Sequence, residues 1–232
     1  MKKGLTGATG NFYVDLHEYR EMIFVNKVLK KQDIFIDIGA NIGSYSIIAG
    51  SRCNNVYSFE PLPTTFNILK KNIVFNDFEN KINAFNIGLS FEKNKLKFTN
   101  DLDTVNHVAL DNSSNFSEVS VDKLDNIIEL KDKDYFLKID VEGFELNVIK
   151  GATKLLSSGN IFAILIETND STEKYGFNKS EIFSFLKKYN YEPFDYDYSS
   201  NKITEYKDDD NTIFILDKDF VNNRLNNTKW KV

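Results

Sequence analysis

The sequence predicts an α/β fold built on a mostly parallel sheet, and three observations support that prediction. Residues 35–43 join a short apolar run, typical of a buried parallel strand, to a turn that contains two glycines. Residues 44–49 have the pattern of the helix that follows. Apolar runs that end in an acid recur at 56–60, 135–140 and 161–167. A strand, a glycine turn and a helix in this order open a nucleotide-binding α/β domain.

The turn after the first strand narrows the class of ligand. Gly39 and Gly43 stand four apart and lack the G-x-G of a dinucleotide-binding loop. Asp37 precedes them, and a carboxylate there repels a pyrophosphate but suits a ligand with a cationic amino group. Glu60 ends the second strand, where an acid can accept hydrogen bonds from both ribose hydroxyls. A ribose joined to a cationic amino-acid tail describes S-adenosylmethionine.

These residues have distinct expected roles toward that cofactor. Asp37 is expected to face the amino-acid tail or a water bound to it. Gly39, Asn41 and Gly43 are expected to let the backbone pass close beneath the ligand. Glu60 is expected to bind the ribose.

The composition excludes several other classes of protein. The chain is 41% hydrophobic and 27% charged, which fits a single domain over residues 1–232 with a sizeable core. A net charge of −5 argues against a large nucleic-acid interface. Cys53 is the single cysteine, so no internal disulfide can form and a reducing, cytoplasmic location is expected. No apolar run approaches the ~18 residues of a membrane span, and the first residues lack the apolar core of a signal peptide.

The next elements follow from local patterns. Residues 1–30 are expected to form a loose arm followed by an amphipathic helix that starts near residue 17. Residues 62–76 carry the apolar stripe of a second helix, and residues 81–89 alternate apolar and polar side chains as a third strand does. Asn86 falls at the end of that strand, where its amide could approach an adenine or simply belong to the strand end.

Residues 91–126 interrupt this rhythm and are expected to form an insertion near the acceptor site. Alternating apolar residues at 96–98 and 119–121 predict two short strands that pair across a polar loop. Long loops beside a ligand crevice are often functional. His107 lies in this loop and is either a solvated histidine or a candidate catalytic base.

A second informative stretch follows at 135–145. Its strand delivers Asp140 to the carboxyl edge of the sheet, where ligands of open α/β sheets bind. Glu142 and Glu145 follow within five residues, and carboxylates this close repel one another unless a ligand, a lysine or a cation compensates. An alternative explanation is that these acids lie at the start of a helix, where the helix dipole stabilises negative charge. This explains Glu145 well and Asp140 poorly.

The C-terminal part is expected to complete the sheet. Residues 145–156 predict a helix, and the strand that ends at Glu167 places Asn169 at the same edge as Asp140. A helix capped by Ser180 is expected next. Strand candidates follow at 191–198, 202–206 and 212–216, and residues 217–232 are predicted to be a polar tail with Trp230 as its anchor.

Four stretches together closely resemble the FkbM family of S-adenosylmethionine-dependent methyltransferases. They are residues 35–43, 59–61, 138–145 and 150–152, and the resemblance extends from about residue 33 to 167. The resemblance implies a class I methyltransferase fold, a Rossmann-like three-layer sandwich around a seven-stranded, mostly parallel sheet whose last strand is antiparallel. It also implies O-methylation of a small-molecule or glycan acceptor, commonly a sugar hydroxyl of a surface glycan or a secondary metabolite.

The residue that removes the acceptor proton has two candidates. Asp140 could act as the base or orient the hydroxyl, and His107 has an ordinary pKa of ~6.5 that suits neutral pH. A metal is not favoured, but Asp140, Glu167 and Asn169 offer the oxygen ligands that Mg²⁺ or Ca²⁺ takes, at positions that resemble those of metal-dependent catechol-type O-methyltransferases. Two further classes stay open. One is an NAD-dependent oxidoreductase, which would be expected to have a G-x-G-x-x-G loop that this sequence lacks. The other is a catalytically silent, methyltransferase-like module that binds a partner, which would be favoured if S-adenosylmethionine did not bind.

Overall fold

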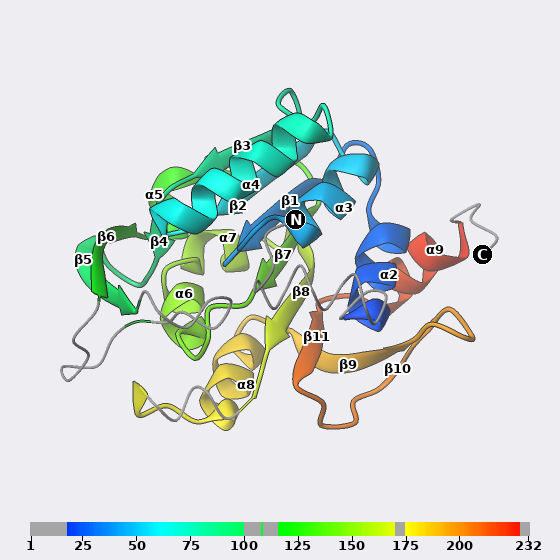
Figure 1. Ribbon diagram of the computed structural model, residues 1–232. Helices are drawn as coiled ribbons and strands as arrows, with labels where there is room; N and C mark the ends of the chain where they lie inside the picture. The colour runs from blue at the N-terminus through cyan, green and yellow to red at the C-terminus, as the bar shows by residue number, and fades with distance from the viewer. Residues whose placement is uncertain (1–17, 100–107, 109–115, 170–174, 228–232) are drawn as a thin grey trace.

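The computed structural model describes residues 18–99, 108, 116–169 and 175–227. Its central sheet has eight strands in the order β10-β9-β11-β8-β7-β1-β2-β3, with helices on both faces (Figure 1). The strands are β1 Ile34–Ile38, β2 Asn55–Phe59, β3 Ile82–Phe85, β7 Tyr135–Ile139, β8 Ile161–Glu167, β9 Glu192–Asp197, β10 Lys202–Glu205 and β11 Asn211–Ile215.

The five strands from β3 to β8 run parallel, whereas β11 is antiparallel to both of its neighbours. This is the expected mostly parallel sheet with an antiparallel late strand. It has one strand more than the seven expected, because β10 turns back and pairs antiparallel with β9 at the edge. The central strands β1 and β7 are buried along their whole length, which explains their mostly apolar sequence. Asp37 and Lys138 are the two buried charged exceptions.

Two hydrophobic cores hold the helices against the sheet. One face is covered by α2 Tyr19–Val28, α3 Ser44–Arg52, α4 Pro63–Phe75 and α9 Lys218–Asn226. The other face is covered by α5 Leu124–Ile127, α6 Glu145–Lys150, α7 Thr153–Ser157 and α8 Lys179–Lys187. The three layers confirm the predicted sandwich. Within the described residues, no helix is both long enough and apolar enough to cross a membrane.

A second, three-stranded sheet lies beside the main one. It contains β4 Gly88–Leu89, β5 Asn94–Thr99 and β6 Phe116–Asp122, in the order β4-β6-β5. The predicted pairing within the insertion is confirmed, because Leu96 lies opposite Val119. The single strand expected over 81–89 is wrong, since the chain leaves the main sheet after β3 and joins β6 through β4.

The helix expected over 145–156 is divided into α6 and α7 at Gly151. A Cβ at Gly151 would lie 2.1 Å from the carbonyl oxygen of Ser90, so the break lets the two segments approach closely. The start of α8 also differs from the prediction. Asn178 rather than Ser180 is the N-cap, and it forms a capping box with Glu181.

The C-terminal segment is an ordered helix where it is described, and not the polar tail predicted for 217–232. Helix α9 lies beside α2 (Figure 1) and buries Val221 and Leu225 in the core. Its Arg224 is also buried, where it pairs with Asp33 (2.6 Å) and contacts Asp134. These ion pairs join positions about 190 and 90 residues apart, which explains why local polarity misled the prediction. Trp230, the arm over 1–14 and His107 lie outside the described residues.

Candidate active site

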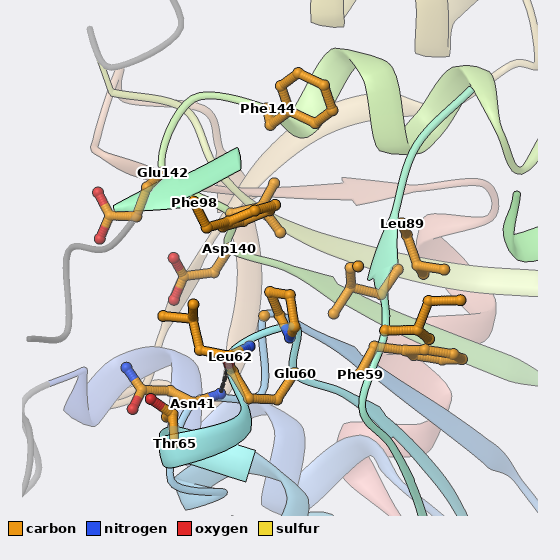
Figure 2. Close-up of a pocket in the computed structure, with 16 residues that line it drawn as sticks. Asn41, Phe59, Glu60, Leu62, Thr65, Leu89, Phe98, Asp140, Glu142 and Phe144 are labelled. Atoms are coloured by element: carbon orange, nitrogen blue, oxygen red, sulfur yellow. Dashed lines mark hydrogen bonds between the residues drawn. The ribbon is translucent and has the colours of Figure 1, made fainter. Parts of the chain in front are cut away.

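A cleft opens at the carboxyl edge of the sheet, where β1 lies between β2 and β7 (Figure 2). Its walls come from the β1–α3 turn, the β2–α4 junction, β4, β5 and the β7–α6 turn. The cleft encloses about 700 Å³ of space, open solvent included. Elements far apart in the chain meet here, because parallel strands present their carboxyl ends at one edge.

The β1–α3 turn has a left-handed backbone at three positions. Gly39, Asn41 and Gly43 all have positive φ, at 78°, 50° and 98°. A Cβ on Gly39 would lie 1.8 Å from the carbonyl oxygen of Asp140, and one on Gly43 would lie 2.6 Å from the side chain of Leu69. The glycines therefore let the turn approach other parts of the protein. Gly39 and Asn41 line the cleft, whereas Gly43 does not.

Glu60 lies on the wall of the cleft and is 6% exposed. Its two carboxylate oxygens accept hydrogen bonds from the backbone N–H groups of Asn41 (3.0 Å) and Leu62 (2.9 Å). Burial raises the pKa of Glu60 to about 7, although these two amides favour the ionised form. Each carboxylate oxygen can accept a second hydrogen bond, so the group can still receive hydroxyls from a ligand.

Asp37 lies beneath the cleft and is fully buried. The alternation of β1 directs Asp37 toward α3, where the hydroxyl of Ser46 donates to its Oδ2 at 2.5 Å. Its Oδ1 has no hydrogen-bond partner among the described residues. Lys138 is its register partner on β7. Because Asp37 does not line the cleft, its contact with a cofactor tail stays a prediction.

Asn86 has a local role that the sequence did not indicate. Its side-chain amide donates to the carbonyl oxygens of Glu60 (2.9 Å) and Pro61 (2.8 Å). The residue is exposed and lies outside the lining of the cleft, whereas its neighbours Ile87 and Gly88 are part of it. Asn86 therefore holds the end of β2 in place, and its predicted approach to an adenine stays a prediction.

Asp140 lies on the opposite wall and is held by Lys138. The ammonium of Lys138 lies 2.8 Å from Oδ2 of Asp140 and 4.7 Å from the ring centroid of Tyr45. The Lys138 side chain is 7% exposed and that of Asp140 is 30% exposed. Burial lowers the pKa of Lys138, but the charges of Asp140 and Asp37 outweigh it and raise that pKa above its usual value. The pair presents an oriented carboxylate to the cleft.

A cluster of carboxylates adjoins Asp140. One oxygen each from Asp140, Glu142 and Glu167 lies within 4.8 Å of the others. Burial, followed by the charges of Asp140 and Glu142, raises the pKa of Glu167 to about 9. Below them Glu145 is buried and accepts the N–H groups of Val141 and Gly143, and burial raises its pKa to about 7.

This cluster could share protons or hold a divalent cation. The set expected from the sequence has Asn169 where this cluster has Glu142, and the role of Asn169 as a ligand stays a prediction. Glu142 has a positive φ of 54°, so the β7–α6 turn separates it from the helix that follows. The sequence leaves Glu142 open between an acid at a helix start and a carboxylate compensated by a ligand, a lysine or a cation.

Apolar and aromatic walls complete the cleft. Leu62 and Ile87 line it near Glu60, and Phe98 and Phe144 line it near Asp140. None of these four residues was predicted, because an isolated apolar residue at the end of a strand resembles any core residue. Of the two candidate bases, Asp140 lines the cleft, and His107 lies outside the described residues.

Residues 37–193 match the family described as the methyltransferase FkbM domain. Over 178 residues the chain is 29% identical to the hexuronic acid methyltransferase AglP of Haloferax volcanii, and the match covers 69% of this chain and 73% of that protein. The solved structure of methyltransferase FkbM from Methylobacillus flagellatus KT is similar with a TM-score of 0.52 at 17% sequence identity, over 80% of this chain and 43% of that one.

A putative methyltransferase from Streptococcus mutans, solved in complex with SAH, has a TM-score of 0.50 at 10% identity, over 84% of this chain and 94% of that one. These two structures support the class I methyltransferase fold, and the chain spans less than half the length of the FkbM structure. Nothing in them favours the dinucleotide-binding alternative. The family match covers more than half of the chain and includes Gly39, Glu60 and Asp140. The chain therefore belongs to the methyltransferase FkbM domain family.

Proposed function

We propose that the chain is an S-adenosylmethionine-dependent O-methyltransferase that acts on a sugar hydroxyl of a surface glycan or a secondary metabolite. The observation that supports it is that Glu60, Asn41 and Asp140 line the same cleft. A sugar acceptor is supported by the similarity to AglP, a hexuronic acid methyltransferase. The activity, the acceptor and the cofactor are all part of the proposal.

The lining of the cleft fits the proposed cofactor. Glu60 keeps acceptor capacity toward two ribose hydroxyls, beyond the backbone amides that it already binds. Leu62 and Ile87 offer apolar contact to an adenine ring. A side chain at Gly39 would collide with the backbone of Asp140, so the turn and the end of β7 approach each other closely in the wall of the cleft. When bound, S-adenosylmethionine would supply a methyl group on a positively charged sulfur.

Asp140 would act on the acceptor hydroxyl. Its carboxylate would accept the hydroxyl hydrogen and align the oxygen with the methyl carbon. The acceptor oxygen would receive the methyl group that S-adenosylmethionine supplies, and its proton would pass to Asp140 or through Asp140 to solvent. Lys138 would keep the carboxylate oriented through their 2.8 Å ion pair. His107 stays the second candidate base.

The ribose role of Glu60 is testable through pH. Its pKa of about 7 means that the carboxyl is neutral in acid and ionised above that value. Because the ionised form accepts hydroxyl hydrogen bonds better, we expect the affinity for 5′-methylthioadenosine to rise about tenfold between roughly pH 5.5 and 8.5. This probe contains the ribose and adenine but no titrating amino-acid tail. Isothermal titration calorimetry gives the affinity.

Glu60→Gln is the matched variant for that experiment. It is expected to bind the probe more weakly at high pH and to lose the pH dependence. An equal pH dependence in Glu60→Gln would contradict the ribose role, and absence of binding at every pH in the unchanged protein would contradict the proposed function.

Asp140→Asn is expected to lower the rate of methyl transfer about 10²–10⁴-fold while changing cofactor affinity little. The amide cannot take the hydroxyl proton, although it keeps the shape of the side chain. Transfer from labelled S-adenosylmethionine to pooled nucleotide sugars and glycans measures the rate. Asp197→Asn, at the end of β9 and outside the lining of the cleft, is the control and should leave the rate unchanged.

The same assay separates a base from a metal ligand. We expect activity to survive treatment with EDTA. Loss of activity that Mg²⁺ restores would instead give Asp140, Glu142 and Glu167 the role of ligands. A rate unchanged in Asp140→Asn would exclude this residue as the base.

A further inference from the structure

The turn between β7 and α6 forms much of one wall of the cleft. Asp140, Val141, Glu142 and Phe144 all line the cleft. Figure 2 shows Glu142 and Phe144 across the cleft from Asn41. A ligand that fills the cleft therefore rests against this turn, and the affinity depends on how firmly the turn is held in one conformation.

The backbone of this turn needs support from other groups. Glu142 has a φ of 54° and Gly143 a φ of 104°, so two consecutive residues are in the left-handed region. That region is unfavourable for a residue with a side chain, such as Glu142, and persists where the surrounding structure imposes it. The groups that impose it on this turn therefore also shape the wall of the cleft.

Glu145 holds the turn from beneath. Its Oε1 accepts hydrogen bonds from the backbone N–H groups of Val141 (3.1 Å) and Gly143 (3.0 Å). These donors lie on either side of Glu142 in the chain, so one carboxylate oxygen fixes both flanks of the left-handed residue. Glu145 is the first residue of α6, where the helix dipole favours its charge. Its side chain is fully buried and lies outside the lining of the cleft.

The two ends of the turn are fixed by other contacts. At its start, the N–H of Asp140 donates to the carbonyl oxygen of Ile38 on β1 at 3.0 Å. At its end, Phe144 packs edge-on against Tyr175, with 5.5 Å between ring centroids. Loss of the hydrogen bonds to Glu145 would therefore release the middle of the turn while β7 and α6 stay in place.

We infer that Glu145 is a positioning residue for cofactor binding, an inference that rests on the proposed function. It holds the β7–α6 turn in the shape that the bound cofactor contacts, so less conformational freedom is lost on binding. It acts through the turn and touches neither the cofactor nor the acceptor. The property that matters is an oxygen that reaches both amides, and not the negative charge as such.

Two variants separate this reach from the charge. Glu145→Gln keeps the length of the side chain and a carbonyl oxygen that can accept both amides, but it loses the charge. Glu145→Asp keeps the charge, but it is shorter by one methylene and should not reach both amides. Isothermal titration calorimetry with SAH measures the affinity. We expect Glu145→Asp to bind SAH about tenfold more weakly and Glu145→Gln to stay within about threefold of the unchanged protein.

Asp125→Leu is the matched control. Asp125 also accepts two backbone N–H groups, those of Lys154 (2.8 Å) and Leu155 (3.1 Å), but it lies outside the lining of the cleft. Its loss should lower the resistance to urea and leave the affinity for SAH unchanged. If this control bound SAH as weakly as Glu145→Asp, general destabilisation would account for the effect and the inference would be overturned.

Hydrogen exchange in the unchanged protein gives a second measurement that does not depend on the folding of a variant. The amides of Val141 and Gly143 should exchange at least about tenfold more slowly than the same amides in an unstructured peptide. Rapid exchange of both would overturn the inference. So would normal SAH binding by Glu145→Asp, or equal losses in Glu145→Asp and Glu145→Gln. Failure of the unchanged protein to bind SAH would instead overturn the proposed function.

Discussion

Replacement of Gly39 by alanine is expected to destabilise the protein by about 2–5 kcal/mol and to abolish cofactor binding. Two physical terms add. The residue has φ of +78°, where a side chain is strained, and its Cβ would lie 1.8 Å from the carbonyl oxygen of Asp140. The turn or the end of β7 must move, and the shared wall between Glu60 and Asp140 moves with it. Chemical denaturation and titration with SAH measure the two effects.

Gly159 provides a closely matched control. Its φ of +74° is almost the same, but a Cβ there would meet nothing within 4 Å. Gly159→Ala should therefore lose only the stability that the strained backbone costs, about 1–2 kcal/mol in the free energy of unfolding. It should bind SAH as the unchanged protein does. Equal losses of stability in the two variants would show that the close approach of the β1–α3 turn to Asp140 contributes nothing.

Arg224→Leu is expected to lower the free energy of unfolding by about 3–5 kcal/mol at neutral pH. The arginine is 2% exposed and Asp33 is fully buried, so the substitution leaves a carboxylate in the core without its cation. The guanidinium also packs on the rings of Phe162 (4.3 Å) and Phe220 (4.6 Å), contacts that leucine replaces only in part. Urea denaturation followed by circular dichroism measures the change.

The pH dependence of this loss distinguishes the buried charge from simple repacking. Burial already raises the pKa of Asp33, and removal of the arginine, which lowers it, should raise it further. The deficit of Arg224→Leu should then be largest at neutral pH and should shrink as the pH falls and Asp33 takes up a proton. Lys95→Ala, which breaks an exposed ion pair with Glu118, should change stability little. A deficit independent of pH would contradict the charge argument.

Much of the site was predictable because its signals are local. The apolar run before Asp37 predicted a buried strand, and Gly39 with Gly43 predicted a turn after it. The structure has both, and the two glycines have positive φ. Glu60 and Asp140 were predicted at the ends of parallel strands, and parallel strands bring their carboxyl ends to one edge whatever the rest of the chain does.

Other features depend on contacts between distant segments. Helix α9 was predicted to be a polar tail because its sequence is rich in polar and charged residues. Its Arg224, however, pairs with Asp33, which lies 191 residues earlier in the chain. The local pattern favours one helix over 145–156, but α6 ends at Gly151, where a Cβ would lie 2.1 Å from the carbonyl oxygen of the distant Ser90. Phe98 and Phe144 are connected by a series of contacts: Phe98 pairs with Val108, Val108 accepts a hydrogen bond from Tyr175, and Tyr175 packs against Phe144.

The sequence by itself determined the alternation of strands and helices around the site, the glycine turn, the two acids on its flanks and the family. Periodicity, turn chemistry and the direction of parallel strands are properties of short segments, so they can be predicted from the local sequence. Only the tertiary structure decided that Asp37 lies beneath the cleft, that Lys138 holds Asp140 and that Glu142 joins Glu167. Those placements depend on which side chains share a face and how closely two backbones approach, and both are set by packing across the whole chain.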